Sequence, residues 1–97
     1  SWVLAGPKEG GNDAFSSSCH GAGRRLSRTA ARKLIDSDEL RARLEASGIH
    51  VRAKTPNVLA EEAPDAYKDV DEVIRLSASA NLARPVARLR PFAVIKG

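Results

Sequence analysis

Apolar residues gather near both ends of the chain in runs that are typical of β-strands. Residues 1–5 combine Trp, Val and Leu in an extended run that a Gly-Pro pair ends, which predicts a short strand. We expect the sheet partners of this strand to lie elsewhere. Residues 83–97 carry aliphatic and aromatic side chains interrupted by Pro85 and Pro91. Because proline cannot donate to a sheet ladder, this segment predicts one or two strands with each proline at an end, an edge or a bulge.

A third strand pattern lies in the middle of the chain. Residues 49–53 alternate apolar and polar side chains, which predicts a strand with one buried face. His50 falls on the polar face, and no second His, Cys or carboxylate stands at metal-binding spacing around it. We therefore expect a solvent-facing histidine there rather than a ligand. The glycine-rich residues 8–13 predict a loop or turn.

Between these strands, apolar residues recur at helical spacing. Ser27 is the predicted N-cap of a first helix with arginines and lysine on its outer side. Ser37 is the predicted N-cap of a second helix, in which Leu40 and Leu44 lie one turn apart and belong to the core. Gly48 provides the stop after that helix.

Two further helical segments follow. Residues 56–59 open a short one that Pro64 closes, and Asp69 caps another. Acidic residues at the start of this last helix, Asp71 and Glu72 among them, are favoured by the helix dipole, so we do not expect them to bind metal. The predicted inward side of the last helix consists of Val70, Val73, Ile74 and Ser77.

Short strands with intervening helices predict a mixed α/β fold.

A turn before the first helix carries the strongest chemical signal. Residues 18–24 read Ser-Cys-His-Gly-Ala-Gly-Arg, so His20 stands directly before a Gly-Ala-Gly turn and a pair of arginines. Gly21 and Gly23 lack a Cβ, which lets backbone N–H groups approach an anion closely, and a helix N-terminus follows. These features predict a phosphate site within reach of His20. Spacing alone leaves open the alternative of an ordinary surface-loop histidine.

Composition limits the size and the surroundings of the protein. The chain has 97 residues, one cysteine and no methionine, so it is at most one small domain with a modest core. It begins abruptly with apolar residues, and we expect it to be a fragment or a processed piece. A single cysteine excludes an internal disulfide, and no apolar run approaches the roughly 20 residues of a membrane span. We therefore expect a soluble, cytoplasmic protein without a membrane partner.

Charge is distributed unevenly along the chain, whose formal net charge is +4. A basic stripe beside a phosphate site suits a polyanionic partner such as RNA, while a solvated helix face is the alternative for each arginine. The basic stripe of the first half comprises Arg24, Arg25, Arg28, Arg32, Lys33, Arg41 and Arg43, and the acidic block of the second half comprises Glu61, Glu62, Asp65, Asp69, Asp71 and Glu72.

Three stretches in this order resemble the carboxy-terminal part of the RtcB family of RNA-splicing ligases. They are SCHGAGR at residues 18–24, LAEEAPDAYKDVDEV at 59–73 and VARLRPFAVIKG at 86–97. The resemblance covers nearly the whole chain. It implies that residues 1–97 are the carboxy-terminal segment of a single larger catalytic domain with a layered α/β fold, whose metal-binding part lies upstream and is absent here.

The resemblance implies a ligase that uses GTP and manganese. Such enzymes join an RNA 3′-phosphate or 2′,3′-cyclic phosphate end to a 5′-hydroxyl end, in tRNA splicing and RNA repair. The implied partners are RNA, as tRNA halves or broken RNA ends, GTP, and an accessory activating protein. His20 is implied as the nucleophile that becomes linked to GMP, because a neutral imidazole can attack phosphorus and form a reactive phosphoramidate.

The remaining implied site residues are nucleotide contacts. Ser1 is expected near the guanine, with a plain strand-start residue as the alternative. Tyr67 is expected to stack on the guanine, with a buried structural tyrosine as the alternative, and Lys96 to contact the nucleotide rather than serve as a surface lysine. The turn formed by Gly21, Ala22 and Gly23 is expected to approach the nucleotide through its backbone.

Each of two neighbours of the turn has two alternative assignments, and no residue of the chain is expected to bind metal. Arg24 steadies phosphate or lies on a helix surface, and Cys19 is a small packing residue rather than a metal ligand. The isolated fragment is expected to be inactive. Two other functions remain as alternatives: a non-catalytic basic RNA-binding module, which leaves the His20 turn unexplained, and a small nucleotide-binding regulatory domain, which leaves the arginine-rich helices unexplained.

Overall fold

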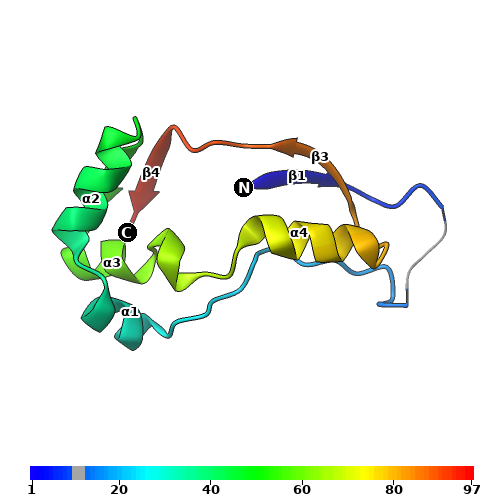
Figure 1. Ribbon diagram of the computed structural model, residues 1–97, viewed down its shortest axis with the longest axis horizontal. Coiled ribbons are helices and arrows are strands. Elements are labelled where there is room, and N and C mark those ends of the chain that lie inside the picture. Colours follow the sequence, from blue (N-terminus) through cyan, green and yellow to red (C-terminus); the bar gives the residue numbers. More distant parts are fainter. Residues whose placement is uncertain (10–12) are drawn as a thin grey trace. The chain divides into compact units, whose positions relative to one another are not determined.

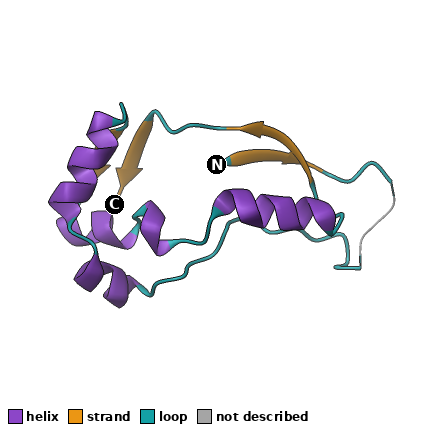
Figure 2. Ribbon diagram, viewed as in Figure 1, coloured by secondary structure: helices purple, strands orange, loops and turns teal. Residues whose placement is uncertain are grey.

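A computed structural model describes residues 1–9 and 13–97, which divide into two compact units. Unit 1 comprises Ser1–Gly23 and Lys68–Arg90, and unit 2 comprises Arg24–Tyr67 and Pro91–Gly97. Figures 1 and 2 show the helices and short strands that make up the two units. The loop predicted at residues 8–13 falls partly on residues 10–12, which lie outside the described residues.

Unit 1 contains an antiparallel pair of strands, β1 (Trp2–Ala5) and β3 (Arg84–Arg88). Trp2 pairs with Arg88 at one end and Ala5 with Arg84 at the other, with a register irregularity between them. The sheet partner of the first strand therefore lies elsewhere, as expected. This partner lies about 80 residues along the same chain, a pairing that local hydrophobic patterns cannot reveal.

Helix α4 (Val70–Ser79) packs against this strand pair and begins where the sequence predicts. The Asp69 side chain accepts a hydrogen bond from the Asp71 backbone N–H at 2.9 Å, so Asp69 is the N-cap. Asp71 in turn accepts from the Trp2 indole N–H at 2.8 Å and from the Arg88 guanidinium at 2.7 Å. One carboxylate on the helix thus ties both strands to it, and Figure 1 shows the helix lying along them. Ile74 and Ser77 on its inner side are buried, as predicted.

Unit 2 begins with two helices, α1 (Arg28–Leu34) and α2 (Ser37–Ala46). The predicted cap of α1 is confirmed, since the Ser27 hydroxyl accepts from the Ala30 N–H at 3.1 Å. The predicted cap of α2 is wrong by one residue. Asp36 is the N-cap, because its carboxylate accepts from two backbone N–H groups of the first turn, and an ionised acceptor is stronger than the Ser37 hydroxyl. The helix ends before Gly48, which has a φ of +77°.

A third helix, α3 (Pro56–Glu61), is capped by Thr55 and followed by the 3-10 helix η1 (Pro64–Ala66). The expectation that Pro64 closes α3 is wrong, because α3 ends at Glu61 and Pro64 opens η1 instead. Proline suits this first position since its missing N–H would lack a helical partner there anyway.

The second strand pair of the described residues is parallel and consists of β2 (His50–Ala53) and β4 (Ala93–Lys96). The alternation predicted for residues 49–53 is confirmed, since Val51 is buried and His50 is exposed. The His50 ring meets the Phe92 ring edge-on, with 5.4 Å between ring centroids. The core of unit 2 consists of Leu40, Ile49, Val51, Leu59 and Ala63, with Ile35, Leu44, Ala53 and Val94 packed against it.

The observed helices and short strands confirm the predicted mixed α/β class and are consistent with a fragment of a larger RtcB fold. The described residues form only two-stranded sheets, so every strand has one paired edge. Neither proline of the last segment interrupts a central strand. Pro85 lies in β3, which has a single partner, and Pro91 precedes β4.

Candidate functional site

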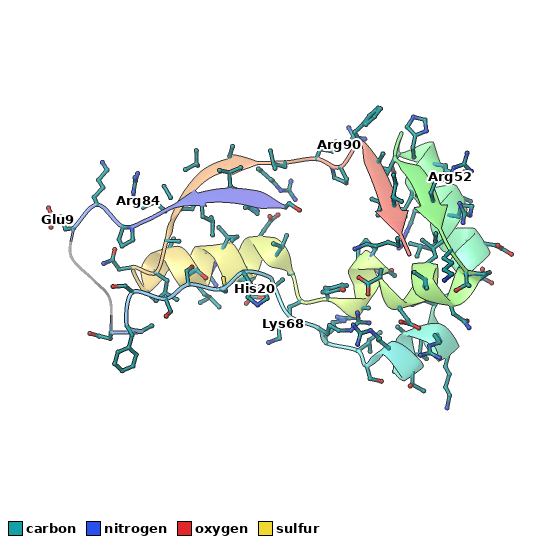
Figure 3. The ribbon with its side chains drawn as sticks, turned by 180° about the vertical axis from the view of Figure 1, so that it is seen from behind. Glu9, His20, Arg52, Lys68, Arg84 and Arg90 are labelled. Carbon is teal, nitrogen blue, oxygen red and sulfur yellow. The ribbon has the colours of Figure 1, made fainter. Side chains whose placement is uncertain are left out.

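His20 lies in unit 1 on the segment that leads into the glycine turn, and its side chain is exposed. In Figure 3 this segment runs along α4 on the side away from the strand pair. The residue before it is anchored, since the Cys19 sulfur lies 3.4 Å from the Ser77 hydroxyl on α4. This contact supports the packing role expected for Cys19. Because Cys19 is anchored and the His20 imidazole is exposed, His20 is accessible to a ligand.

The glycine turn after His20 has the backbone freedom that an anion site needs. Gly23 has a φ of +78°, a conformation that side chains with a Cβ rarely adopt. A Cβ built on Gly21 would meet no atom within 4 Å, so this side of the turn is open. The Gly23 carbonyl accepts a hydrogen bond from the Lys68 N–H at 2.9 Å, which ties the turn to the residues before α4.

Lys68 also brings positive charge to this turn. Its ammonium nitrogen lies 3.8 Å from the position that a Cβ on Gly23 would occupy. Figure 3 labels Lys68 and His20 in the same unit, near the start of α4. An ammonium group beside an open glycine turn favours a phosphate at this place.

Ser1, the first of the expected nucleotide contacts, is also in unit 1. Its backbone carbonyl accepts from the Leu89 N–H at 2.8 Å, which extends the β1–β3 pairing by one residue. The side chain is exposed. The structure thus supports the strand-start role of Ser1 and leaves a base contact as a prediction.

Tyr67 lies in unit 2, where contacts with Arg24 and Glu62 hold it. Its backbone forms an isolated β-bridge with Arg24. Its hydroxyl donates to a Glu62 carboxylate oxygen at 2.8 Å and accepts from the Arg24 guanidinium at 3.1 Å. The guanidinium carbon lies 4.8 Å from the centre of the Tyr67 ring, a cation–π contact.

These contacts shift two titrations in opposite directions. The hydrogen bond to Glu62, burial and the negative charge of Glu62 raise the pKa of Tyr67 above its ordinary value. The same hydrogen bond, with the nearby charges of Lys96 and Arg24, lowers the pKa of Glu62. Tyr67 is therefore a protonated donor and Glu62 an ionised acceptor across the neutral pH range.

Arg24 directs its guanidinium into unit 2. Besides Tyr67, it donates to the Glu61 carbonyl at 2.6 Å and to the Leu26 carbonyl at 3.0 Å. The expectation that Arg24 lies on a helix surface is wrong, since α1 begins only at Arg28. Its hydrogen bonds organise the polypeptide around Tyr67, and nothing in this arrangement supports the phosphate role.

Lys96 lies at the end of β4, and its ammonium nitrogen is 3.6 Å from a carboxylate oxygen of Glu62. Two of the expected nucleotide contacts, Tyr67 and Lys96, thus share one acidic partner within unit 2. His20, its glycine turn and Ser1 belong to unit 1. The expected nucleotide contacts are therefore divided between the two units.

The basic stripe of the first half is less free than the sequence suggests. At least five of its seven cations form ion pairs, and four of these pair with the acidic block. Arg32, for example, lies 2.7 Å from Glu61. This pairing lowers the local positive potential that these side chains can offer to RNA, and so weakens the alternative of a basic RNA-binding module. The five pairs are Arg24–Glu62, Arg28–Glu61, Arg32–Glu61, Arg41–Glu45 and Arg43–Asp65.

Comparison with known proteins identifies the relatives of this chain. The family profile described as "tRNA-splicing ligase RtcB" matches residues 1–97. The chain belongs to the RtcB family. The proteins named tRNA-splicing ligase RtcB from Methanopyrus kandleri and Thermococcus kodakarensis are 47% and 52% identical to it over all 97 residues. The RNA-splicing ligase RtcB homolog 1 of Entamoeba histolytica is 46% identical over the same length. The chain spans 10%, 20% and 18% of these three relatives, respectively.

RtcB membership confirms the resemblance that the three sequence stretches carry, whereas residue roles within the site stay predictions. Two residues of the site, Glu62 and Lys68, were missed by reasoning from the sequence. A signal for Glu62 was available. Two adjacent acids, Glu61 and Glu62, follow the predicted helical segment 56–59. The helix dipole disfavours negative charge at this carboxyl end. Lys68 had no such signal, since only the folded turn brings it near Gly23.

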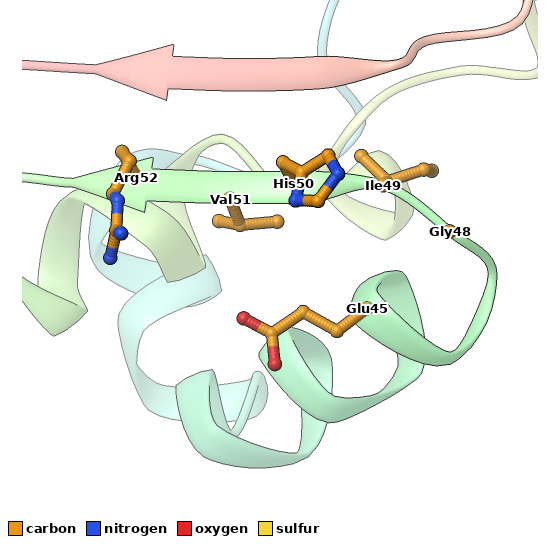
Figure 4. Close-up of a pocket in the computed structure, with 6 residues that line it drawn as sticks. All are labelled: Glu45, Gly48, Ile49, His50, Val51 and Arg52. Carbon is orange, nitrogen blue, oxygen red and sulfur yellow. The ribbon is translucent and has the colours of Figure 1, made fainter.

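A pocket in unit 2 is lined by residues other than those expected to bind the nucleotide. Its lining consists of Glu45 and residues 48–52, among them His50 and Arg52 (Figure 4). None of the expected site residues is part of this lining in the described structure. Across residues 1–9 and 13–97, no group of three or more His, Cys, Asp or Glu side chains could hold a metal ion. No helix in the described part of the chain is long and apolar enough to cross a membrane.

Proposed function

We propose that this chain is the carboxy-terminal segment of an RNA ligase that joins 3′-phosphate or 2′,3′-cyclic phosphate ends to 5′-hydroxyl ends with GTP and manganese. In this proposal residues 1–97 belong to one larger catalytic domain. What supports it is the match to the RtcB family over all 97 residues, together with relatives that are named as tRNA-splicing ligases. The single observation that carries the chemistry is an exposed His20 before an open glycine turn.

In the first step His20 acts as the nucleophile. A nitrogen lone pair of the neutral imidazole attacks the α-phosphorus of GTP, which is consumed as a substrate. An N–P bond forms, the bond from the α-phosphorus to its bridging oxygen breaks, and pyrophosphate leaves. The result is a phosphoramidate between His20 and GMP. Backbone N–H groups of the Gly21–Gly23 turn and the ammonium of Lys68 would face the negative charge that develops on the phosphate.

The later steps return His20 to its starting state. An oxygen of the RNA 3′-phosphate attacks the GMP phosphorus, and the N–P bond breaks. The 5′-hydroxyl oxygen of the second RNA then attacks the 3′-phosphorus, GMP leaves, and a phosphodiester joins the two ends. A 2′,3′-cyclic end must first be opened by water to give the 3′-phosphate.

The other expected residues bind the nucleotide in this proposal. Tyr67 stacks on the guanine, Lys96 contacts the nucleotide, and Ser1 lies close to the base. Stacking on an aromatic ring is worth about 1–3 kcal/mol per base. Because the described residues do not fit a metal site, we assign no manganese ligand to this chain and derive no step through the metal.

The proposal is tested in a graft, in which residues 1–97 replace the matching segment of the Thermococcus kodakarensis relative. Incubation with manganese and GTP labelled at the α-phosphate should leave acid-labile label on the protein. His20→Ala should remove the label. His50→Ala is the matched control, because His50 is the second of the two histidines and is also exposed, and it should label normally. Failure of the unsubstituted graft to label, or undiminished label in His20→Ala, would refute the proposal.

A further inference from the structure

Glu62 is the common partner of the two unit 2 residues that the proposed function assigns to the nucleotide. Its carboxylate accepts from the Tyr67 hydroxyl at 2.8 Å, and the same oxygen lies 3.6 Å from the Lys96 ammonium nitrogen. Arg24 approaches the other carboxylate oxygen at 3.7 Å. The side chain of Glu62 is 23% exposed, so these partners replace much of its solvent shell.

The position of Glu62 in the fold is unfavourable without these partners. It is the C-cap residue of α3, directly after Glu61 at the last helical position. Unpaired carbonyl groups at a helix carboxyl end repel a carboxylate, so two adjacent acids there are unusual. Each acid has its own cations. Glu61 pairs with Arg32 at 2.7 Å and with Arg28 at 3.6 Å.

We propose that Glu62 is a positioning residue of the nucleotide site, which fixes the ring of Tyr67 through its hydroxyl and keeps the Lys96 ammonium near the same carboxylate oxygen. This inference rests on the proposed function for the roles of Tyr67 and Lys96. The contacts themselves are independent of it.

The contact of Glu62 with Tyr67 is stronger than its contact with Lys96, and the two contacts serve different purposes. The Tyr67 hydroxyl is held by a short, charge-assisted hydrogen bond, and the Arg24 guanidinium covers one face of its ring. A base can then stack only on the opposite face. The Lys96 ammonium lies beyond direct hydrogen-bond distance of Glu62 and is 44% exposed. Glu62 therefore holds the tyrosine firmly and keeps the lysine near while leaving it free to turn toward a nucleotide.

The test measures guanylylation by GTP in the Thermococcus kodakarensis graft. Glu62→Gln keeps the size of the side chain and removes its charge, and Tyr67→Phe removes the hydroxyl and keeps the ring. Each should raise KM for GTP by about fivefold and change kcat by less than about twofold. Because both substitutions weaken the same hydrogen bond, the double variant should raise KM much less than the 25-fold product of the two.

Glu61→Gln is the matched control. Glu61 is the adjacent acid, is similarly shielded, and pairs with α1 rather than with Tyr67 or Lys96, so KM for GTP should stay unchanged. The inference is overturned if Glu62→Gln leaves KM unchanged, if Glu61→Gln raises KM equally, or if the double variant gives the full product. A role in folding alone would lower thermal stability without moving KM.

A second measurement separates this inference from the proposed function. Tyr67 is the only tyrosine, so ultraviolet absorbance of the 97-residue chain reports its titration directly. Glu62→Gln should lower the pKa of Tyr67, because the carboxylate raises it in the parent chain. If the graft takes no label from GTP yet Tyr67 shows this change, the proposed function fails and the contact stands. An identical Tyr67 titration in both chains would refute the contact and the inference with it.

Discussion

Replacing Arg24 with lysine removes the group that organises the backbone around Tyr67. The guanidinium donates to the Glu61 carbonyl at 2.6 Å, the Leu26 carbonyl at 3.0 Å and the Tyr67 hydroxyl at 3.1 Å. Lysine keeps the charge but can reach only one such acceptor, and each lost hydrogen bond to a charged group is worth about 1.5–3 kcal/mol. The side chain is 22% exposed, so water replaces part of this loss. We expect unit 2 to lose about 2–4 kcal/mol.

Amide hydrogen exchange of the 97-residue chain measures this loss locally. The backbone N–H groups of Arg25 and Leu26 both donate to the Ala66 carbonyl, at 2.9 and 3.1 Å. A loss of 2–4 kcal/mol corresponds to exchange that is about 30- to 900-fold faster at these amides. Arg25→Lys is the matched control, since the Arg25 side chain is exposed and donates once, at 3.2 Å. Equal exchange rates in Arg24→Lys and Arg25→Lys would refute the structural role of Arg24.

The remaining predictions concern the core, pH and the isolated chain. In urea unfolding of the Thermococcus kodakarensis graft, Leu40→Ala should cost about 2–5 kcal/mol of unfolding free energy because Leu40 is 2% exposed, whereas Leu34→Ala, at 71% exposure, should cost less than about 0.5 kcal/mol. The lowered pKa of Glu62 gives stability that is present above its ordinary value of 4.5 and is lost as pH falls through the folded pKa. The raised pKa of Tyr67 gives stability that is present below its ordinary value of 10.0 and is lost as pH rises through the folded pKa. Because both shifts depend on the Glu62 carboxylate, Glu62→Gln should flatten the acid and the alkaline sides of a plot of unfolding free energy against pH. The isolated 97 residues should not ligate RNA with manganese and GTP, and ligation by them would contradict this expectation. They should also show an unfolding free energy below about 5 kcal/mol, or self-association in sedimentation. Sharp two-state unfolding of a monomer would contradict this second expectation.

Local elements of this fold could be predicted from the sequence because their causes are local. The Ser27 and Asp69 caps, the stop at Gly48 and the alternation in residues 49–53 each depend on a few adjacent residues. The one-residue error at the α2 cap also concerns adjacent residues. Asp36 and Ser37 are both good caps, and only the folded backbone decides which one accepts the first N–H groups.

Strand pairing and side-chain partners could not be predicted, because they depend on segments far apart in the sequence. The β1–β3 pair joins residues near both ends, and the Trp2–Asp71 hydrogen bond spans 69 positions. The same limit applies to the candidate site. His20 could be predicted from its glycine neighbours, whereas the contacts of Glu62 with Tyr67 and Lys96 appear only in the folded chain.

The central claim is that His20 carries GMP and passes it to RNA, and peptide mapping of the labelled graft tests it most directly. After reaction with GTP and manganese, trypsin should release the GMP adduct on the peptide of residues 9–24, which contains His20 but not His50. A chase with RNA ending in a 3′-phosphate should discharge this adduct, and RNA ending in a 3′-hydroxyl should leave it in place. GMP on the peptide that contains His50, or an adduct that the 3′-phosphate RNA does not discharge, would contradict the account.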